Sequence, residues 1–195
     1  MYAKSATTIA NILEAARKLF VSKNYADVTM SGIAEAAQVT KGALYHHFAS
    51  KERLYEAMML ADLGKKKHLM QAAVESEGTC RDRLRCLTVN FLDLTPEKRD
   101  LMRLVRRDIN IFKDPLRHRL VRAYQAALPE QVEAIIRDGI RDGELGNSDP
   151  RLLAWEYVAM VEVVLNDYAQ EVLGPNGQLA EYVINLFFNG VGNHK

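Results

Sequence analysis

Residues 39–54 read VTKGALYHHFASKERL and concentrate five chemically distinctive residues in barely two turns of helix. A lysine, a glycine, a tyrosine and two adjacent histidines lie between Thr40 and Ser50, residue types that commonly begin a helix. A metal site, a catalytic pair and a phosphate-binding surface would each use some of these residues. The spacing and the surrounding sequence decide among the three.

Two short helices joined by a tight turn are predicted around this stretch. Thr29 is a suitable N-cap for a first helix that ends near Ala37. Thr40 caps a second helix, so only Gln38 and Val39 connect the two. Small alanines on the inward side allow short helices to cross at the steep angle of a helix-turn-helix. The inward residues are Ile33, Ala34, Ala37, Val39, Leu44 and Phe48, and the outward ones are Thr40, Lys41, Gly42, Tyr45, His46 and His47.

The outward residues suit a surface that binds DNA, because the second helix of such a motif enters the major groove by its N-terminal residues. The Thr40 hydroxyl and the free N–H groups behind it can hold a phosphate. Lys41 can reach a phosphate or a guanine edge, and Gly42 lets the backbone approach a base. Tyr45 and His46 offer further donors at phosphate distance.

The helix that begins at Ser50 adds one more expected contact. Ser50 caps a long third helix of this region, and Lys51 follows it directly. We expect the two residues to form a second phosphate clamp beside the recognition helix.

The adjacent histidines do not have the spacing of a metal site. Metal ligands on a helix share one face and commonly lie four residues apart, whereas His46 and His47 point about 100° apart. A catalytic pair needs a pocket, and this stretch is predicted to lie on a convex surface. We expect His46 to face phosphates and His47 to pack partly against the first helix, with no metal bound.

Composition sets the broad class of the protein. The chain has 195 residues, of which 48% are hydrophobic, enough for one ordinary core and a small satellite domain. Its net charge is only +1, and residues 1–52 hold six basic against four acidic side chains, so a DNA-binding function must rest on local placement. We expect a cytoplasmic protein without a signal peptide or membrane span. Cys80 and Cys86, six residues apart on a predicted helix, point about 120° apart and indicate reduced, helix-packing thiols.

Helical periodicity runs through the rest of the chain, which predicts an all-α fold. Thr79 and Asp82 have the spacing of a capping box. Pro129 falls inside a helical run that it should kink or split. The last two helices, near 150–168 and 179–191, each carry two apolar faces, and a helix of this kind needs two partners. We predict a homodimer built on these two helices; the alternative is a monomer in which both helices are central.

The segment VTMSGIAEAAQVTKGALYHHFASKERL resembles the DNA-binding domain of the TetR family of transcriptional regulators. The resemblance spans residues of about 7–60 and includes the family's K-G-x-L-Y-x-H-F core, present here as Lys41, Gly42, Leu44, Tyr45, His47 and Phe48. Two positions depart from the family pattern. Gln38 stands where relatives usually carry a glycine with positive φ, and Gly32 stands where an acidic residue often completes the cap.

The resemblance implies a dimer of about nine helices per chain, with a helix-turn-helix DNA-binding domain at 1–52 and an effector-binding and dimerisation domain at 53–195. It implies a repressor that binds a palindromic operator in double-stranded DNA and is released by a small-molecule effector, with no cofactor. DNA contact is then assigned to Thr40, Lys41, Gly42, Tyr45, His46 and Lys51, to which we add Thr29, the cap of the first motif helix.

An effector pocket would place polar groups on otherwise apolar helix faces, where a buried charge is costly unless it is paired. The candidates are His68, Asn90, Asp108, Trp155, Glu162 and Asn166. Each also has a structural interpretation. Asp108 can pair with a neighbouring arginine, His68 can be a core histidine, and Glu162 can lie at the dimer seam.

Two other classes of function compete with a ligand-responsive repressor. A DNA-bound adaptor would keep the fold and respond to a protein partner in place of a small molecule. An all-α enzyme is disfavoured, because the sequence has no nucleophile elbow, metal-ligand spacing or glycine-rich phosphate loop.

Overall fold

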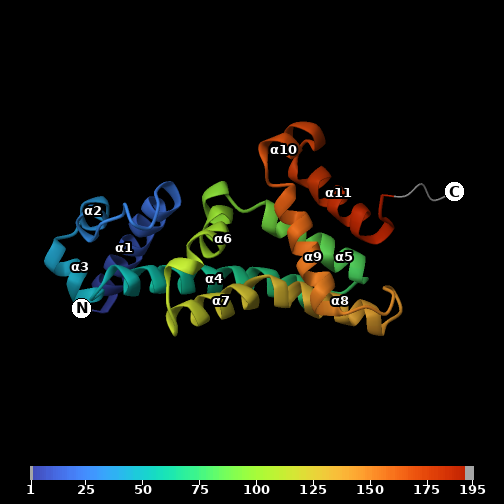
Figure 1. Cartoon of the computed structure of the whole chain (residues 1–195), viewed down its shortest axis with the longest axis horizontal. Coiled ribbons are helices and arrows are strands. Elements are labelled where there is room, and N and C mark those ends of the chain that lie inside the picture. The colour runs from blue at the N-terminus through green and yellow to red at the C-terminus, as the bar shows by residue number, and fades with distance from the viewer. Residues whose placement is uncertain (1, 192–195) are drawn as a thin grey trace. The chain divides into compact units, whose positions relative to one another are not determined.

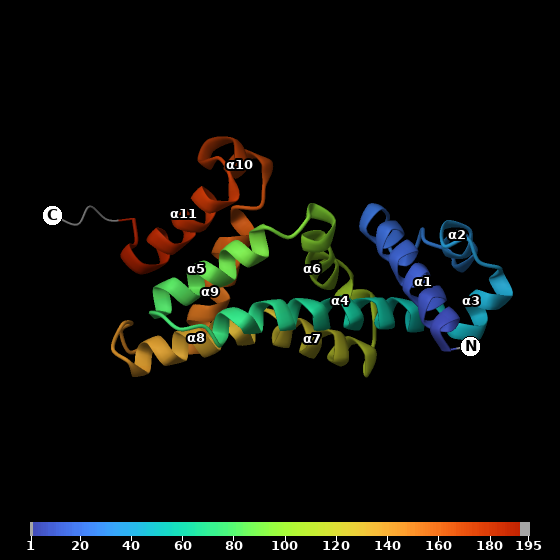
Figure 2. The same cartoon turned by 180° about the vertical axis from the view of Figure 1, so that it is seen from behind.

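The computed structural model describes residues 2–191; the first residue and the last four, which the predicted domain bounds include, lie outside the described part. The described chain is all helical, as predicted (Figures 1 and 2). Its elements are α1 (Tyr2–Ser22), α2 (Met30–Ala36), α3 (Lys41–His47), α4 (Lys51–Val74), α5 (Cys80–Leu92), α6 (Pro96–Asp108), the 3-10 helix η1 (Ile109–Ile111), α7 (Leu116–Ala127), α8 (Pro129–Arg141), α9 (Pro150–Val163), α10 (Asp167–Leu173) and α11 (Asn176–Asn189).

Packing divides the helices into two units that differ from the predicted domains. The first unit comprises residues 1–64 and 96–123, and the second comprises 65–95 and 124–195. The sequence division at residues 52 and 53 follows the end of the helix-turn-helix, whereas α6 packs against α1 and so belongs with it. The division falls after Gly64, within the range of α4, and after Ala123, within the range of α7.

The core of the first unit forms where α1 packs against α2 and α6. Ile12, Phe20, Ile33 and Leu44 are fully buried there. An aromatic cluster closes this core, with ring centroids 4.9 to 5.6 Å apart. Its members are Phe20, Tyr25, Tyr55 and Phe112. Because these rings come from separate segments of the chain, their contacts hold those segments together.

The helix-turn-helix has the predicted caps. The Thr29 Oγ1 accepts a hydrogen bond from Gly32 N at 3.0 Å, and the Thr40 Oγ1 accepts one from Ala43 N at 3.1 Å. Gln38 has a φ of 55°, which confirms the expectation that this turn needs a left-handed residue. A side chain in that region carries a steric cost of roughly 1–2 kcal/mol, which glycine would avoid.

The second unit is built on α5, α8, α9 and α11, with α5 packed against both α8 and α11 (Figure 2). A Cβ added to Gly139 of α8 would lie 2.7 Å from the Cys80 side chain, so the close crossing of α5 and α8 requires glycine. The Tyr157 hydroxyl donates to Leu84 O at 3.2 Å and also pairs with Thr88, which ties α9 to α5. These two contacts set the spacing of the helices.

Two breaks raise the number of α-helices in the described chain from the expected nine or so to eleven. The first was predicted: α7 ends at Ala127, and α8 begins at Pro129, where a missing N–H costs nothing. The second was not predicted. α9 stops at Val163, and Asn166 caps the separate helix α10 by accepting a hydrogen bond from Ala169 N at 2.8 Å. Asn166 therefore begins a helix.

Candidate nucleic-acid interface

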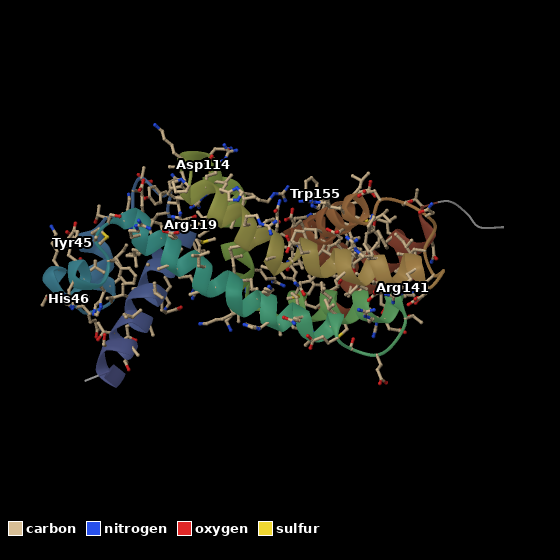
Figure 3. All side chains as sticks on the ribbon, turned by 90° about the horizontal axis from the view of Figure 1, so that it is seen from below. Tyr45, His46, Asp114, Arg119, Arg141 and Trp155 are labelled. Atoms are coloured by element: carbon tan, nitrogen blue, oxygen red, sulfur yellow. The ribbon has the colours of Figure 1, made fainter. Side chains whose placement is uncertain are left out.

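α3 presents a row of polar groups to solvent while its other face packs inward. Leu44 is fully buried, whereas Lys41, Gly42 and His46 are exposed. The Tyr45 side chain is 44% exposed, large for an aromatic residue on a seven-residue helix. Figure 3 shows Tyr45 and His46 pointing outward from α3. The predicted division of this helix into an inward and an outward face is thus present.

Gly42 has no packing reason to be glycine. A Cβ built on it would meet no atom within 4 Å, and it lies in helical backbone, where glycine costs about 1 kcal/mol relative to alanine. Nothing within the fold accounts for this cost. A close approach by another molecule to the exposed face of α3 would account for it.

The hydroxyl groups of the two capping threonines can still donate a hydrogen bond. Because each Oγ1 accepts from a backbone N–H, its own hydroxyl proton remains available to an acceptor outside the protein. Thr29 and Thr40 are both exposed. They can therefore donate to phosphate oxygens at the starts of α2 and α3.

The position of the Lys51 side chain differs from the one predicted. Its ammonium group, which we expected to face a phosphate, donates to the backbone carbonyls of Tyr25, Ala26 and Val28 at 2.8, 3.4 and 2.9 Å. It also lies 4.3 Å from the centre of the Tyr25 ring. An ammonium group has three N–H donors, and these carbonyls use all of them. Lys51 therefore anchors the segment between α1 and α2.

The adjacent histidines differ in exposure. The His46 ring is exposed, the His47 residue is half-buried, and their ring centroids lie 5.3 Å apart in an edge-on arrangement. Among the residues that the structure describes, no three His, Cys, Asp or Glu side chains gather as they would around a metal ion.

Asp108 pairs with a neighbouring arginine, which is the structural alternative to a role in an effector site. It is 2% exposed, forms an ion pair with Arg107 at 2.7 Å and accepts a hydrogen bond from the Tyr55 hydroxyl at 3.0 Å. Arg107 also donates to the carbonyls of Phe20 and Lys23, at the end of α1. These partners satisfy the buried carboxylate, and all of them belong to the first unit.

The other effector candidates lie in the second unit, in different settings. His68 is exposed and is therefore not a core histidine. Asn90 donates to Cys86 Sγ at 3.7 Å, and Asn166 is a helix cap. Trp155 is 51% exposed, with the Arg151 guanidinium 5.6 Å from its ring centre. Glu162 accepts a hydrogen bond from the Tyr124 hydroxyl at 3.3 Å and is only partly exposed.

The face of α4 that carries His68, predicted to be apolar and inward, is exposed. Lys66 is 4% exposed and follows Leu63 and precedes Met70 on the buried side, whereas His68 lies on the opposite side. The buried series advances by three or four residues through Met59, Leu63, Lys66, Met70 and Ala73. This spacing was available in the sequence, and its single lysine obscured it.

A hollow lies on the described surface of the second unit. It is open, has a volume of about 350 Å³ and lies where α9 meets α11. Its lining includes Glu156, Met160 and Phe187. None of the predicted effector residues lines it.

Within residues 2–191, no helix combines the length and apolarity that crossing a bilayer requires.

Comparison with known proteins supplies the family context. Residues 12–58 match the model of the bacterial regulatory proteins of the tetR family, and residues 77–191 match that of the tetracyclin repressor-like C-terminal domain. A relative over most of both chains is the uncharacterized HTH-type transcriptional regulator YhgD of Bacillus subtilis strain 168. It is 22% identical over 160 residues, which cover 82% of this chain and 83% of YhgD.

Two solved structures have the same fold. The transcriptional regulator FadR from Bacillus subtilis, in complex with stearoyl-CoA, superposes with a TM-score of 0.79 at 18% identity, covering 94% of this chain and 99% of that one. AibR, in complex with isovaleryl coenzyme A and operator DNA, gives a TM-score of 0.77 at 21% identity, covering 93% and 98%. At these identities the likeness concerns the fold.

Proposed function

The chain belongs to the tetR family of bacterial regulatory proteins, and on that premise we propose that it is a repressor that binds a palindromic operator as a homodimer and is released by a small-molecule effector. The observation that carries the proposal is the outward face of α3. Its exposed Tyr45 and His46 and its unexplained Gly42 form a surface that the fold itself does not use. Lys41, Thr40 and Thr29 supply the phosphate donors beside it.

The dimer is proposed to form through α9 and α11, as the sequence predicted. One face of α9 exposes four residues spaced by three or four positions, which we call the α9 stripe: Leu152, Trp155, Ala159 and Val163. The three large members are 57%, 51% and 65% exposed. Soluble proteins rarely leave a continuous apolar stripe uncovered, and Trp is typical of interface centres. A second copy of the chain is the occupant that a twofold repressor requires.

The effector is proposed to bind within the second unit. Glu162 is a predicted residue that is partly buried, and it accepts a hydrogen bond from the Tyr124 hydroxyl, so this pair could orient a ligand. Asn90 is also partly buried, and its amide donates to Cys86 Sγ. His68, Trp155 and Asn166 are exposed and are weaker candidates. Because FadR and AibR are described in complex with acyl-CoA molecules, fatty acyl thioesters are the first class to test.

A panel of acyl-CoA molecules with chains of about 4–18 carbons tests the effector, with free coenzyme A as the control. A true effector at 100 times its Kd raises the stability of the folded protein by about 2.7 kcal/mol, which appears as a higher melting temperature. It must also weaken operator binding. If no small molecule stabilises the protein, while a protein partner changes its DNA affinity, the adaptor alternative replaces this proposal.

A further inference from the structure

Because Lys51 is bound to backbone carbonyls, the phosphate contact expected at the start of α4 needs another residue. The long helix α4 begins three residues after Phe48, the C-cap of α3, so its first turn lies next to the recognition helix. A cation in this turn is well placed to meet the DNA backbone that borders the groove. Lys51 cannot serve, because its ammonium group is used by three carbonyls of the segment before α2.

Arg53, two residues further on, is the available cation of this turn. Its side chain is 69% exposed, and it donates through Nη1 alone, to Glu56 Oε2 at 3.2 Å. A guanidinium group has five N–H donors in a planar fork that matches a phosphate. Arg53 therefore keeps enough donors for a bidentate contact while one of them fixes its direction.

Glu56 is itself held from a distant part of the chain. Its other oxygen, Oε1, accepts a hydrogen bond from Arg119 Nε of α7 at 2.5 Å. The Glu56 side chain is only 11% exposed, whereas that of Arg119 is 40% exposed. The hydrogen bond from Arg119 holds the pKa of Glu56 below its usual value, so this carboxylate stays ionised. Two cations on one anion leave the trio with a net positive charge.

We propose that Arg53, oriented by Glu56 and Arg119, is the residue through which α4 binds a phosphate of the DNA backbone, in the place that Lys51 was expected to take. Arg119 acts as a positioning residue: it holds Glu56 and prevents that carboxylate from neutralising Arg53 completely. Such an arrangement fixes the Arg53 rotamer before binding and reduces the entropy lost when the contact forms. The inference rests on the proposed function, because it needs an operator to be bound.

The test is the salt dependence of operator binding, measured with the full-length protein and a DNA site selected from a random library. Each phosphate that the protein neutralises contributes about −0.9 to the slope of log K against log salt concentration. Arg53→Ala should reduce the magnitude of the slope by about 0.9 and weaken binding by roughly tenfold at low salt, equivalent to about 1.4 kcal/mol. Arg53→Lys, which keeps the charge, should restore most of the slope.

Two control variants separate this contact from general effects of charge and folding. Arg137 of α8 is 65% exposed and paired with Glu133 one turn away, so it matches Arg53 in setting, and Arg137→Ala should leave the slope unchanged. Lys51→Ala should lower the melting temperature, because it frees three carbonyls, and should also leave the slope unchanged. If Lys51→Ala reduces the slope and Arg53→Ala does not, the inference is overturned.

The positioning role of Arg119 has its own test. Arg119→Ala should lower the affinity less than Arg53→Ala does, and adding it to Arg53→Ala should cause no further loss, because Arg119 acts through Arg53. Arg119→Lys, which can still pair with Glu56, should rescue binding. Additive losses would overturn the positioning role. If the unmodified protein selects no DNA at all, the proposed function fails; normal selection with an unchanged Arg53→Ala slope overturns this inference alone.

Discussion

The Tyr55 hydroxyl of α4 donates a 3.0 Å hydrogen bond to Oδ2 of Asp108, the last residue of α6. Both residues are buried, and 53 positions separate them in the chain. Arg107 pairs with the same carboxylate and donates to Phe20 O at the end of α1. One carboxylate thus joins three helices of the unit that carries the recognition helix.

Substitutions at this carboxylate should have graded effects on stability. Tyr55→Phe removes one hydrogen bond to a charged acceptor and should cost about 1.5–3 kcal/mol. Asp108→Ala also strands Arg107 and should cost about 3–5 kcal/mol. Urea unfolding followed by circular dichroism measures both. If Asp108→Ala leaves the free energy of unfolding unchanged and alters effector affinity, Asp108 belongs to the effector site.

Gln38→Gly should make the protein more stable. The substitution removes the strain of a side chain at a φ of 55°, and the gain should be about 0.5–1 kcal/mol after the greater freedom of glycine in the unfolded chain is subtracted. Ala36→Gly is the matched control: it lies two residues away in α2 and should cost about 1 kcal/mol. Destabilisation by both variants would show that the turn is not strained.

The features predicted correctly depend on local chemistry. Thr29, Thr40 and Thr79 cap helices as expected, because an N-cap needs only a hydroxyl and the backbone N–H groups that follow it. Pro129 separates α7 from α8 for an equally local reason, its missing N–H. The residue types at these positions determine the outcome almost independently of the rest of the chain.

The features missed depend on tertiary contacts. A lysine beside a recognition helix can point its ammonium group to solvent or back into the protein, and only the carbonyls of the segment after α1 decide this for Lys51. Asp108 illustrates the same limit, since its main partner Tyr55 is remote in sequence. The cap at Asn166 depends on local chemistry and not on tertiary contacts. An Asn-Asp pair after an apolar run is itself a signal for the start of a helix.

The two cysteines should differ sharply in reactivity. Burial, reinforced by the nearby Glu144, raises the pKa of Cys80 to about 12, whereas Cys86 is exposed. The thiolate is the reactive form, so a maleimide at pH 8 should label one thiol per folded chain and two per unfolded chain. Cys86→Ser should abolish labelling of the folded protein. Equal labelling rates at both sites would contradict the packing of α5 against α8.

The same pKa shift predicts a loss of stability in alkali. The pKa of the Cys80 thiol is near its ordinary value of 9.0 in the unfolded chain, whereas burial raises it to about 12 in the folded chain. The folded state therefore binds more protons between these values, and stability should fall as pH rises through this interval. Comparing unfolding of the native protein and of Cys80→Ala at pH 8 and pH 10 isolates this contribution.

The α9 stripe should control the oligomeric state. Trp155→Glu places a charge at the centre of the proposed interface and should weaken the dimer by about thirtyfold or more, since central aromatic residues often contribute over 2 kcal/mol. Ile111→Asp is the control, because Ile111 is 54% exposed in η1, outside the stripe. Sedimentation velocity over a range of concentrations measures both. A dimer unaffected by Trp155→Glu would place the interface elsewhere.

Selection of binding sites from a random duplex library tests the central claim most directly, because it assumes no operator in advance. We predict a palindromic motif whose half-sites lie about 34–36 Å apart, or a multiple of that distance, bound by two chains. Tyr45→Ala, which leaves the buried face of α3 intact, should recover no motif. Recovery of the same motif by Tyr45→Ala, or of a motif without twofold symmetry, would contradict the assignment of α3 as the recognition helix.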